Sequence, residues 1–207
     1  IAMEYIELDR ETIVQLFKLP KDIIDYLWER IDVAKKKKIC HKKKLAGCIS
    51  QSYVLDDPQN LIIENLLNRD PKMFNFINDE IGRKIHQLHG LRAEELHGGP
   101  QLSDVWVNFQ NKGDFQPVHN HTGTFSFVIW MDIPYDWKDE AKLPFARSNN
   151  GTRAPGGNFA FTYSTPTSRS VLDYNIPMSP KMNGYCCVFP SDLCHQVYPF
   201  YTSDKER

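Results

Sequence analysis

Apolar residues in the first half of the chain recur at three- and four-residue steps, roughly from Arg10 to Leu91. One such stripe contains Ile23, Leu27 and Ile31, which is typical of an amphipathic helix that buries one face. The pattern predicts three helices in this half: one that begins near Pro20, one that follows the capping sequence Asp56-Asp57-Pro58, and one that covers about residues 71–85.

The second half of the chain shows short runs in which apolar and polar residues alternate. These runs follow His97-Gly98-Gly99-Pro100, are separated by turn-forming Gly, Pro, Asn and Asp residues, and read DVWVNFQ, GTFSFVIWMDI, NFAFTY, SVLDYNI and GYCCVFP. The pattern predicts an all-β sandwich or barrel. We expect one domain over residues 1–207, mainly β, in which a helical part at about 1–95 packs on a β core at about 100–207.

The composition is that of an ordinary globular protein, because 41% of the 207 residues are hydrophobic and 25% are charged. The formal net charge of −1 creates no overall field that attracts nucleic acid or an anionic membrane, so we expect neither partner. No stretch approaches the roughly 18 apolar residues of a membrane span. The five cysteines form no C-x-x-C pair, and we expect reduced thiols in a cytoplasmic protein. Lys205-Glu206-Arg207 resembles the start of a strand, so we expect the protein to continue beyond it.

Three of the seven histidines form a constellation suited to a metal ion. His119 and His121 are expected at the beginning of a strand, where residues i and i+2 point to the same face. His195 follows a late strand and a turn at Ser191-Asp192. Two ligands from one strand and a third from a distant strand make a facial set that leaves coordination positions open for substrate and oxygen. The alternative is a group of hydrogen-bonded structural histidines, which an H-x-H pair alone does not exclude.

The residues around these histidines form two longer motifs. The first is WVNFQNKGDFQPVHNHTGTFS, in which Gly113 lies six residues before His119. The second is VFPSDLCHQVYPFYTSDKER, where a strand ending in Phe-Pro is followed by the distal histidine and by T-S-D-x-x-R. Together they resemble the prolyl-4-hydroxylase-like 2-oxoglutarate/Fe(II) oxygenases, most closely the small branch found in bacteria and phages. The resemblance covers about residues 45–207 and is most specific in the two motifs.

This resemblance implies a double-stranded β-helix, or jelly roll, whose metal ligands are His119, His121 and His195. The larger superfamily has H-x-D or H-x-E, so His121 stands where a carboxylate is usual. Three neutral imidazoles leave the site one charge more positive than two imidazoles and a carboxylate. Such a site would hold iron less firmly, or would admit zinc and nickel, which imidazole also suits.

The resemblance also implies a site for the cosubstrate 2-oxoglutarate. Arg207 lies twelve residues after His195, at the position of the arginine that binds the distal carboxylate of the cosubstrate. Gln110 occupies the position where relatives often have a cosubstrate-binding tyrosine, and Asn108 is expected to point the same way. The alternative for these two amides is that they cap strand edges. The polar, turn-rich segment 135–157 is expected to be a lid or substrate grip, or else a solvated insertion.

The function implied by the resemblance is that of a dioxygenase. It would hydroxylate a substrate with release of succinate and CO₂, in the cytoplasm of a bacterium or a phage-infected host cell. Two rival functions remain: a cupin-type metalloenzyme with three histidines that does not use 2-oxoglutarate, and a jelly-roll binding module without catalysis. The sequence contains no motif that chooses between a small-molecule and a peptide substrate, and it leaves the oligomeric state open.

Overall fold

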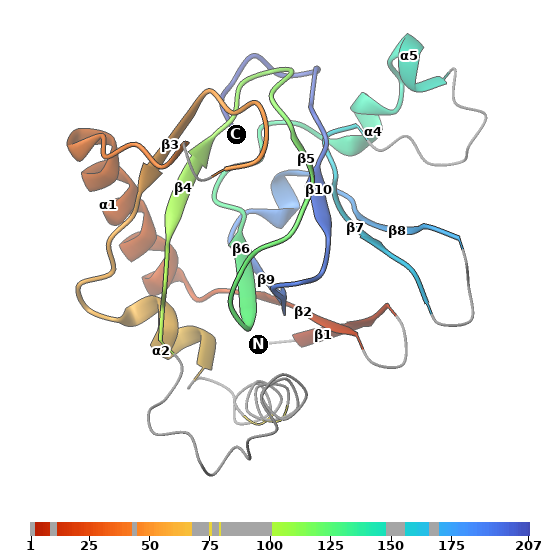
Figure 1. The fold of residues 1–207 in the computed structure, drawn as a ribbon. Coiled ribbons are helices and arrows are strands. Elements are labelled where there is room, and N and C mark those ends of the chain that lie inside the picture. Colours follow the sequence, from red (N-terminus) through yellow and green to blue (C-terminus); the bar gives the residue numbers. More distant parts are fainter. Residues whose placement is uncertain are drawn as a thin grey trace.

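The computed structural model describes residues 3–8, 12–42, 45–67, 75, 79, 101–147, 156–165 and 170–207. Its strands are β1 (Met3–Glu7), β2 (Ile13–Lys18), β3 (Gln51–Val54), β4 (Trp106–Phe109), β5 (Gln116–His119), β6 (Phe125–Ile129), β7 (Phe159–Tyr163), β8 (Leu172–Ile176), β9 (Tyr185–Pro190) and β10 (His195–Val197). Its helices are α1 (Lys21–Lys37), α2 (Leu61–Leu67), α4 (Trp137–Glu140), α5 (Pro144–Arg147) and the 3₁₀ turn η3 (Pro180–Met182). Figure 1 shows α1 lying beside β3 and β4, with the β7–β8 hairpin on the opposite side of the molecule.

Two four-stranded antiparallel sheets form the body of the fold. One has the order β1-β2-β9-β6 and the other β5-β10-β7-β8, while β3 pairs with β4 in a separate two-stranded ribbon. Apolar side chains from both large sheets meet in one buried cluster, which includes Leu16 of β2, Phe161 of β7 and Phe189 of β9. The prediction of a mainly β jelly roll is therefore confirmed, because the core lies between two facing antiparallel sheets.

A second buried cluster joins the helices to the outer face of the β1-β2-β9-β6 sheet. It contains Ile23, Leu27 and Ile31 of α1, the stripe that the sequence predicted, together with Val188 of β9. The second predicted helix is α2, and Asp57 caps it by accepting hydrogen bonds from the backbone N–H groups of its first two residues at 3.1 and 2.9 Å. Tyr26 of α1 donates to the same carboxylate at 2.6 Å, so this cap also joins the two helices. Burial and the bond to Asp57 raise the pKa of Tyr26 to about 12.

The prediction of a helical part at about residues 1–95 is wrong where β1, β2 and β3 lie. Residues 13–18 form β2, which pairs with β9 and with β1, so the N-terminus completes one of the two large sheets. Val14 is fully buried in the core between the sheets, whereas Phe17 is buried on the opposite face, against α1. A strand buried on both faces shows no polar alternation, which is why its pattern resembled a helix. The third predicted helix, at about 71–85, lies outside the described residues, and the single-domain assignment stays a prediction.

All five cysteines are free thiols, as predicted. Cys186 and Cys187 lie side by side in β9 and are completely buried, one facing each of the two clusters. Burial raises the pKa of both thiols, so they are protonated at neutral pH. Within the part of the chain that the structure describes, no helix is long and apolar enough to cross a membrane.

Two of the glycines with positive φ angles differ in their surroundings. Gly113 has φ +88°, and a Cβ built there would meet nothing within 4 Å. Gly157 has φ +71°, and a Cβ built there would overlap the ring of Tyr135. The hydroxyl of Tyr135 donates to the carbonyl of Gly157 at 2.5 Å, so the ring lies directly against this backbone. Of these two positions, only Gly157 requires glycine for both its backbone conformation and its lack of space.

Gly157→Ala and Gly113→Ala should separate the cost of a positive φ angle from the cost of an overlap with Tyr135. Both variants carry the strain of an alanine at positive φ, about 1–2 kcal/mol. Gly157→Ala adds an overlap with Tyr135, so the free energy of unfolding should fall by about 3 kcal/mol or more in total. Urea denaturation of the two variants and the parent measures the difference. Equal destabilisation by the two substitutions would show that Tyr135 does not lie against Gly157.

Candidate metal centre and anion pocket

His119 and His195 face each other across two antiparallel strands. His119 is the last residue of β5, His195 is the first of β10, and the two are direct Cα partners in the β5–β10 register. Directly opposed residues in such a pair project their side chains to the same face of the sheet. Their ring centroids accordingly lie 4.3 Å apart. The expected meeting of a distal histidine with the H-x-H motif is confirmed for this pair.

His121 reaches the same point from a turn. The H-x-H motif was predicted to begin a strand, but β5 ends at His119 and His121 follows it. The strand cannot continue, because Gly123 turns the chain with φ +99° and the backbone N–H of His121 donates to the carbonyl of Ser191 at 2.8 Å. The ring of His121 nevertheless lies 5.1 Å from that of His119 and 5.0 Å from that of His195.

Hydrogen bonds to the backbone orient two of these imidazoles. Nδ1 of His119 lies 2.7 Å from the carbonyl oxygen of Pro117, and Nδ1 of His195 lies 3.0 Å from that of Leu193. A carbonyl only accepts, so in the neutral form of either ring Nδ1 carries the proton and Nε2 keeps its lone pair for a metal ion. One ligand atom from each of the three histidines lies within 4.8 Å of the others. The three side chains therefore form a cluster that could hold a metal ion.

Aromatic rings surround His195 on the side away from the other histidines. Phe159 stacks on its ring at 5.5 Å, and Phe189 meets it edge-on at 4.9 Å. Because these rings exclude water, burial lowers the pKa of His195 to about 3. The pKa of His121 is also lowered, first by burial and then by the neighbouring His119. Neutral imidazole is the form that binds a metal, so neither ring has to lose a proton first at neutral pH.

The inner face of β4 carries a row of polar side chains beside the cluster. Trp106, Asn108 and Gln110 share one face of the extended chain, and the ring of Trp106 touches that of His121 edge-on at 5.6 Å. Among the residues that the structure describes, Asn108 Oδ1 and Gln110 Nε2 are buried without a hydrogen-bond partner, as is Oγ of Ser52, the residue opposite Asn108 on β3. Such unpaired buried atoms are uncommon and suit a polar ligand. The inward direction of this row is confirmed, whereas its role in binding stays a prediction.

Arg207 closes the far end of this row. Its backbone exchanges two hydrogen bonds with that of Gln110, at 3.0 and 2.9 Å. Its guanidinium donates from Nε to Gln110 Oε1 at 2.9 Å and from Nη1 to the hydroxyl of Tyr135 and, at 3.2 Å, to the carbonyl of Gly157. The bond from Nη2 to the carbonyl of Tyr198 is the longest, at 3.4 Å, which makes Nη2 the donor most easily turned to a ligand.

The cluster of three histidines and the guanidinium of Arg207 lie at opposite ends of the same two strand segments. Trp106 begins β4 beside His121, and Gln110 follows that strand beside Arg207. His195 begins β10, and Tyr198 follows that strand, again beside Arg207. At about 3.3 Å per residue, the three steps from His195 to Tyr198 span about 10 Å. A small dicarboxylate could thus contact both ends at once.

Tyr135 and Glu140 are residues of this region that sequence reasoning missed. Both belong to the segment 135–157, which was expected to be a lid or a solvated insertion. Tyr135 is 4% and Glu140 1% exposed, so the start of this segment is part of the packed structure. Their partners are distant in sequence, and no local pattern marks such contacts. Residues 148–155 lie outside the described residues.

Comparisons with known proteins bear on the same residues. The profile of a family described as “Putative 2OG-Fe(II) oxygenase” matches residues 104–207, a segment that contains the three clustered histidines and Arg207. Among solved structures, the chain is similar to a prolyl-4-hydroxylase from Pseudomonas putida with 14% sequence identity. That similarity covers 94% of this chain and 87% of the other, with a TM-score of 0.47. A search of curated proteins finds no match.

The lowered pKa of His195 predicts a loss of stability in acid. In the unfolded chain this residue takes up a proton below its ordinary pKa of about 6.5, whereas the folded, metal-free protein resists protonation until about pH 3. The unfolding free energy of protein treated with a chelator should therefore fall by up to about 1.4 kcal/mol per pH unit between about pH 6 and 4.

His195→Gln should remove this part of the pH dependence. Urea denaturation at pH 8, 7, 6 and 5 measures how the unfolding free energy of parent and variant changes with pH, and between pH 8 and 7 the two slopes should coincide. Parallel slopes throughout would mean that His195 is not held neutral by its aromatic surroundings.

Proposed function

The chain belongs to the 2OG-Fe(II) oxygenase family whose profile it matches, and from this membership we propose that it is a 2-oxoglutarate-dependent Fe(II) dioxygenase that hydroxylates its substrate. The observation that carries the proposal is the joint placement of three converging histidines and a part-buried arginine along the same strands. Three clustered histidines alone would support many functions. The same histidines with the guanidinium of Arg207 about 10 Å away support a cosubstrate that has one metal-binding and one anionic end.

The residues present fit both groups that the family implies. His119, His121 and His195 would hold Fe(II) as neutral ligands, which is a set that imidazole chemistry allows for iron and equally for zinc and nickel. Arg207 and Gln110 would hold the distal carboxylate of 2-oxoglutarate. Gln110 accepts from Arg207 through Oε1, so its unpaired Nε2 is left to donate to an anion beside the guanidinium. Bound together, Fe(II) and 2-oxoglutarate would activate O₂, with release of succinate and CO₂.

The protein's own contribution is positioning and exclusion of water. Arg207 is oriented by four hydrogen bonds before any ligand arrives, so little side-chain entropy is lost on binding. Asn108 offers an unpaired Oδ1 between the two ends of the site, where it could accept from a water or from the substrate. Phe159 and Phe189 keep solvent from the inner side of His195. No side chain has to act as a nucleophile, because the bound groups supply the difficult step.

The rival functions differ from this one in a single respect each. A cupin-type metalloenzyme with three histidines would not require Arg207 beside the end of β10, and a binding module without catalysis would not require the metal. We propose a small-molecule or peptide substrate and a place in the cytoplasm of a bacterium or phage-infected cell. The five free thiols support a reducing compartment.

The proposal is tested by measuring succinate formation. Protein produced without a histidine tag is loaded with Fe(II), mixed with 2-oxoglutarate and O₂, and screened against metabolites and peptides. We expect succinate release that requires both Fe(II) and 2-oxoglutarate and rises with the correct substrate. Oxygen uptake that is independent of 2-oxoglutarate would favour the cupin-type alternative. Failure to bind any divalent metal would favour the binding module.

Arg207→Ala should separate cosubstrate binding from metal binding. The variant lacks the cation for the distal carboxylate, so the apparent KM for 2-oxoglutarate should rise at least tenfold while Fe(II) affinity stays the same. Lys205→Ala removes a neighbouring exposed lysine and is the matched control, with no expected effect on either quantity. An unchanged KM in Arg207→Ala would show that the anchor for the cosubstrate lies elsewhere.

His121 is tested by exchanging its side chain for the carboxylate that the superfamily usually has. His121→Asp should bind Fe(II) at least as tightly as the parent, since it restores a negative ligand at the same position. His121→Ala should weaken Fe(II) binding tenfold or more, and His195→Ala at least as much. Anaerobic Fe(II) titrations give the three dissociation constants. Parent-like affinity in His121→Ala would make His121 a bystander and leave a two-histidine site.

A further inference from the structure

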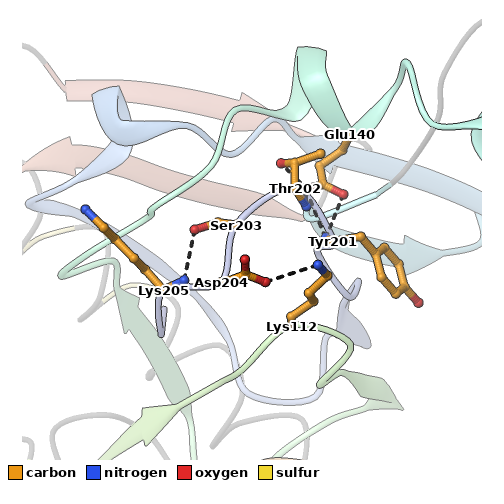
Figure 2. Close-up of polar contacts among 7 residues, drawn as sticks. All are labelled: Lys112, Glu140, Tyr201, Thr202, Ser203, Asp204 and Lys205. Carbon is orange, nitrogen blue, oxygen red and sulfur yellow. Dashed lines mark hydrogen bonds and ion pairs between the residues drawn. The ribbon is translucent and has the colours of Figure 1, made fainter.

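Glu140 is a buried carboxylate that the proposed reaction does not use. It ends α4, is 1% exposed, and pairs with no cation among the residues that the structure describes. Its Oε1 accepts hydrogen bonds from the backbone N–H of Tyr201 at 3.0 Å, from that of Thr202 at 2.8 Å and from the Thr202 hydroxyl at 2.5 Å. Its Oε2 accepts from Tyr201 N–H at 2.9 Å. Figure 2 shows the carboxylate of Glu140 directed at this one turn of the chain.

Burying a carboxylate is costly unless hydrogen bonds replace its hydration, so this arrangement has a specific structural purpose. The helix that carries this carboxylate is capped at its start, and the Glu140 side chain is closely flanked at its base. Asp136 caps α4 by accepting from the backbone N–H of Lys138 at 2.9 Å. Gly156 lies so close that a Cβ there would approach Cβ of Glu140 to 3.2 Å. Glu140 is therefore a rigid attachment point on the side of the fold.

The segment that Glu140 holds leads directly to Arg207. Phe200 begins it with a fully buried ring, which stacks on Tyr135 at 4.6 Å and lies 5.2 Å from the guanidinium of Arg207. Further along, Asp204 pairs with Lys112 at 3.1 Å on the exposed side. Figure 2 shows this second attachment beside the first. An exposed ion pair contributes little, so the Glu140 contact is the stronger of the two.

Tyr135 bonds to Arg207 and feels the charge of Glu140 through space. Its hydroxyl accepts from Arg207 Nη1, and the negative charge of Glu140 is close enough to oppose the ionisation of the phenol. Burial has the largest effect and raises the pKa of Tyr135, while Arg207 acts in the opposite direction. The phenol therefore stays protonated and can both donate to Gly157 and accept from Arg207. A neutral partner leaves the charge of Arg207 available to an anionic ligand.

We infer that Glu140 is a positioning residue, which holds the turn at Tyr201–Thr202 and through it sets the guanidinium of Arg207 for the distal carboxylate of the cosubstrate. The inference rests on the proposed function for the identity of that ligand. The bonds of the Glu140 carboxylate end at Tyr201 and Thr202, so its effect is transmitted through the chain from residue 201 to residue 207. Substitution of Glu140 should therefore weaken the binding of 2-oxoglutarate without weakening the binding of Fe(II).

The test compares Glu140→Gln with Asp139→Asn, which changes an exposed carboxylate on the same helix that pairs with Lys142. Both substitutions remove one negative charge, but only the first weakens the bonds to Tyr201 and Thr202. Calorimetry on anaerobic Fe(II)-loaded protein gives the dissociation constant for 2-oxoglutarate, and a separate titration gives that for Fe(II). Hydrogen exchange reports how firmly the amides of Tyr201 and Thr202 are held.

We expect Glu140→Gln to raise the dissociation constant for 2-oxoglutarate about five- to tenfold, the effect of one charge-assisted hydrogen bond. The two amides should exchange faster, and Fe(II) affinity should stay within about twofold of the parent. Asp139→Asn should match the parent in all three measurements. Thr202→Val removes only the hydroxyl donor. It should raise the dissociation constant for 2-oxoglutarate and speed exchange of the two amides by a smaller factor. This second variant keeps the test valid if Glu140→Gln misfolds.

Three other results would overturn the inference. Parent-like binding of 2-oxoglutarate by Glu140→Gln and Thr202→Val would show that the turn does not position Arg207. An equal loss of Fe(II) and 2-oxoglutarate binding would make Glu140 a general structural residue. If the Fe(II)-loaded parent itself does not bind 2-oxoglutarate, the proposed function and this inference fail together. Measuring the parent beside the variants distinguishes this result from the first two.

Discussion

The pairing of β10 with β5, with His195 opposite His119, is the constraint on which the rest of the site depends. A shift of one residue in this register would turn His195 to the other face of its sheet. β10 is only three residues long and its register with β5 is irregular beyond His195, so these two strands alone would hold it weakly. The regular pairing of β10 with β7 on its other side supplies the missing support, and the rings of Phe159 and Phe161 lie against His195 from there.

The same strand also determines where the cation lies. The chain leaves β10 at Val197, passes the buried ring of Phe200, and returns to pair with Gln110 at Arg207. The position of the arginine relative to the histidines is thus a matter of backbone pairing at both ends, with side-chain contacts refining it. Sites held by paired backbone are more accurately placed than sites carried by free loops, and this one has paired backbone at His195, His119 and Arg207.

Much of the fold could be predicted from the sequence because short apolar runs lie between turn-forming residues. The runs that contain β4, β6, β7, β8 and β9 were recognised for this reason, although β9 is buried on both faces. β2 was missed, since Val14 and Phe17 are buried on opposite faces, no polar alternation remains, and no glycine precedes the run as Gly184 precedes β9. Periodicity measures contrast between two faces, and a strand between a core and a helix has none.

The candidate site, too, could be predicted from the sequence only in part. Histidine pairs can be recognised because few other residues do their chemistry, so His119 and His195 were proposed from type and spacing, whereas Arg207 was proposed from the resemblance to the 2-oxoglutarate/Fe(II) oxygenases. The geometry of His121 was only half predicted, because a bond to Ser191 and the turn at Gly123 replace the expected strand. Residues whose role is to support others have ordinary chemistry. A tyrosine and a glutamate in a polar loop carry no such mark until their distant partners are known.

The adjacent thiols of β9 have a consequence for a protein of an oxygenase family. Peroxide and disulfides react with the thiolate form of cysteine, and burial keeps Cys186 and Cys187 in the thiol form. Sulfur at these two positions therefore fills volume in both clusters with a polarisable atom that oxidants do not attack. The middle of the central strand is chemically inert, although it is built from one of the most readily oxidised side chains.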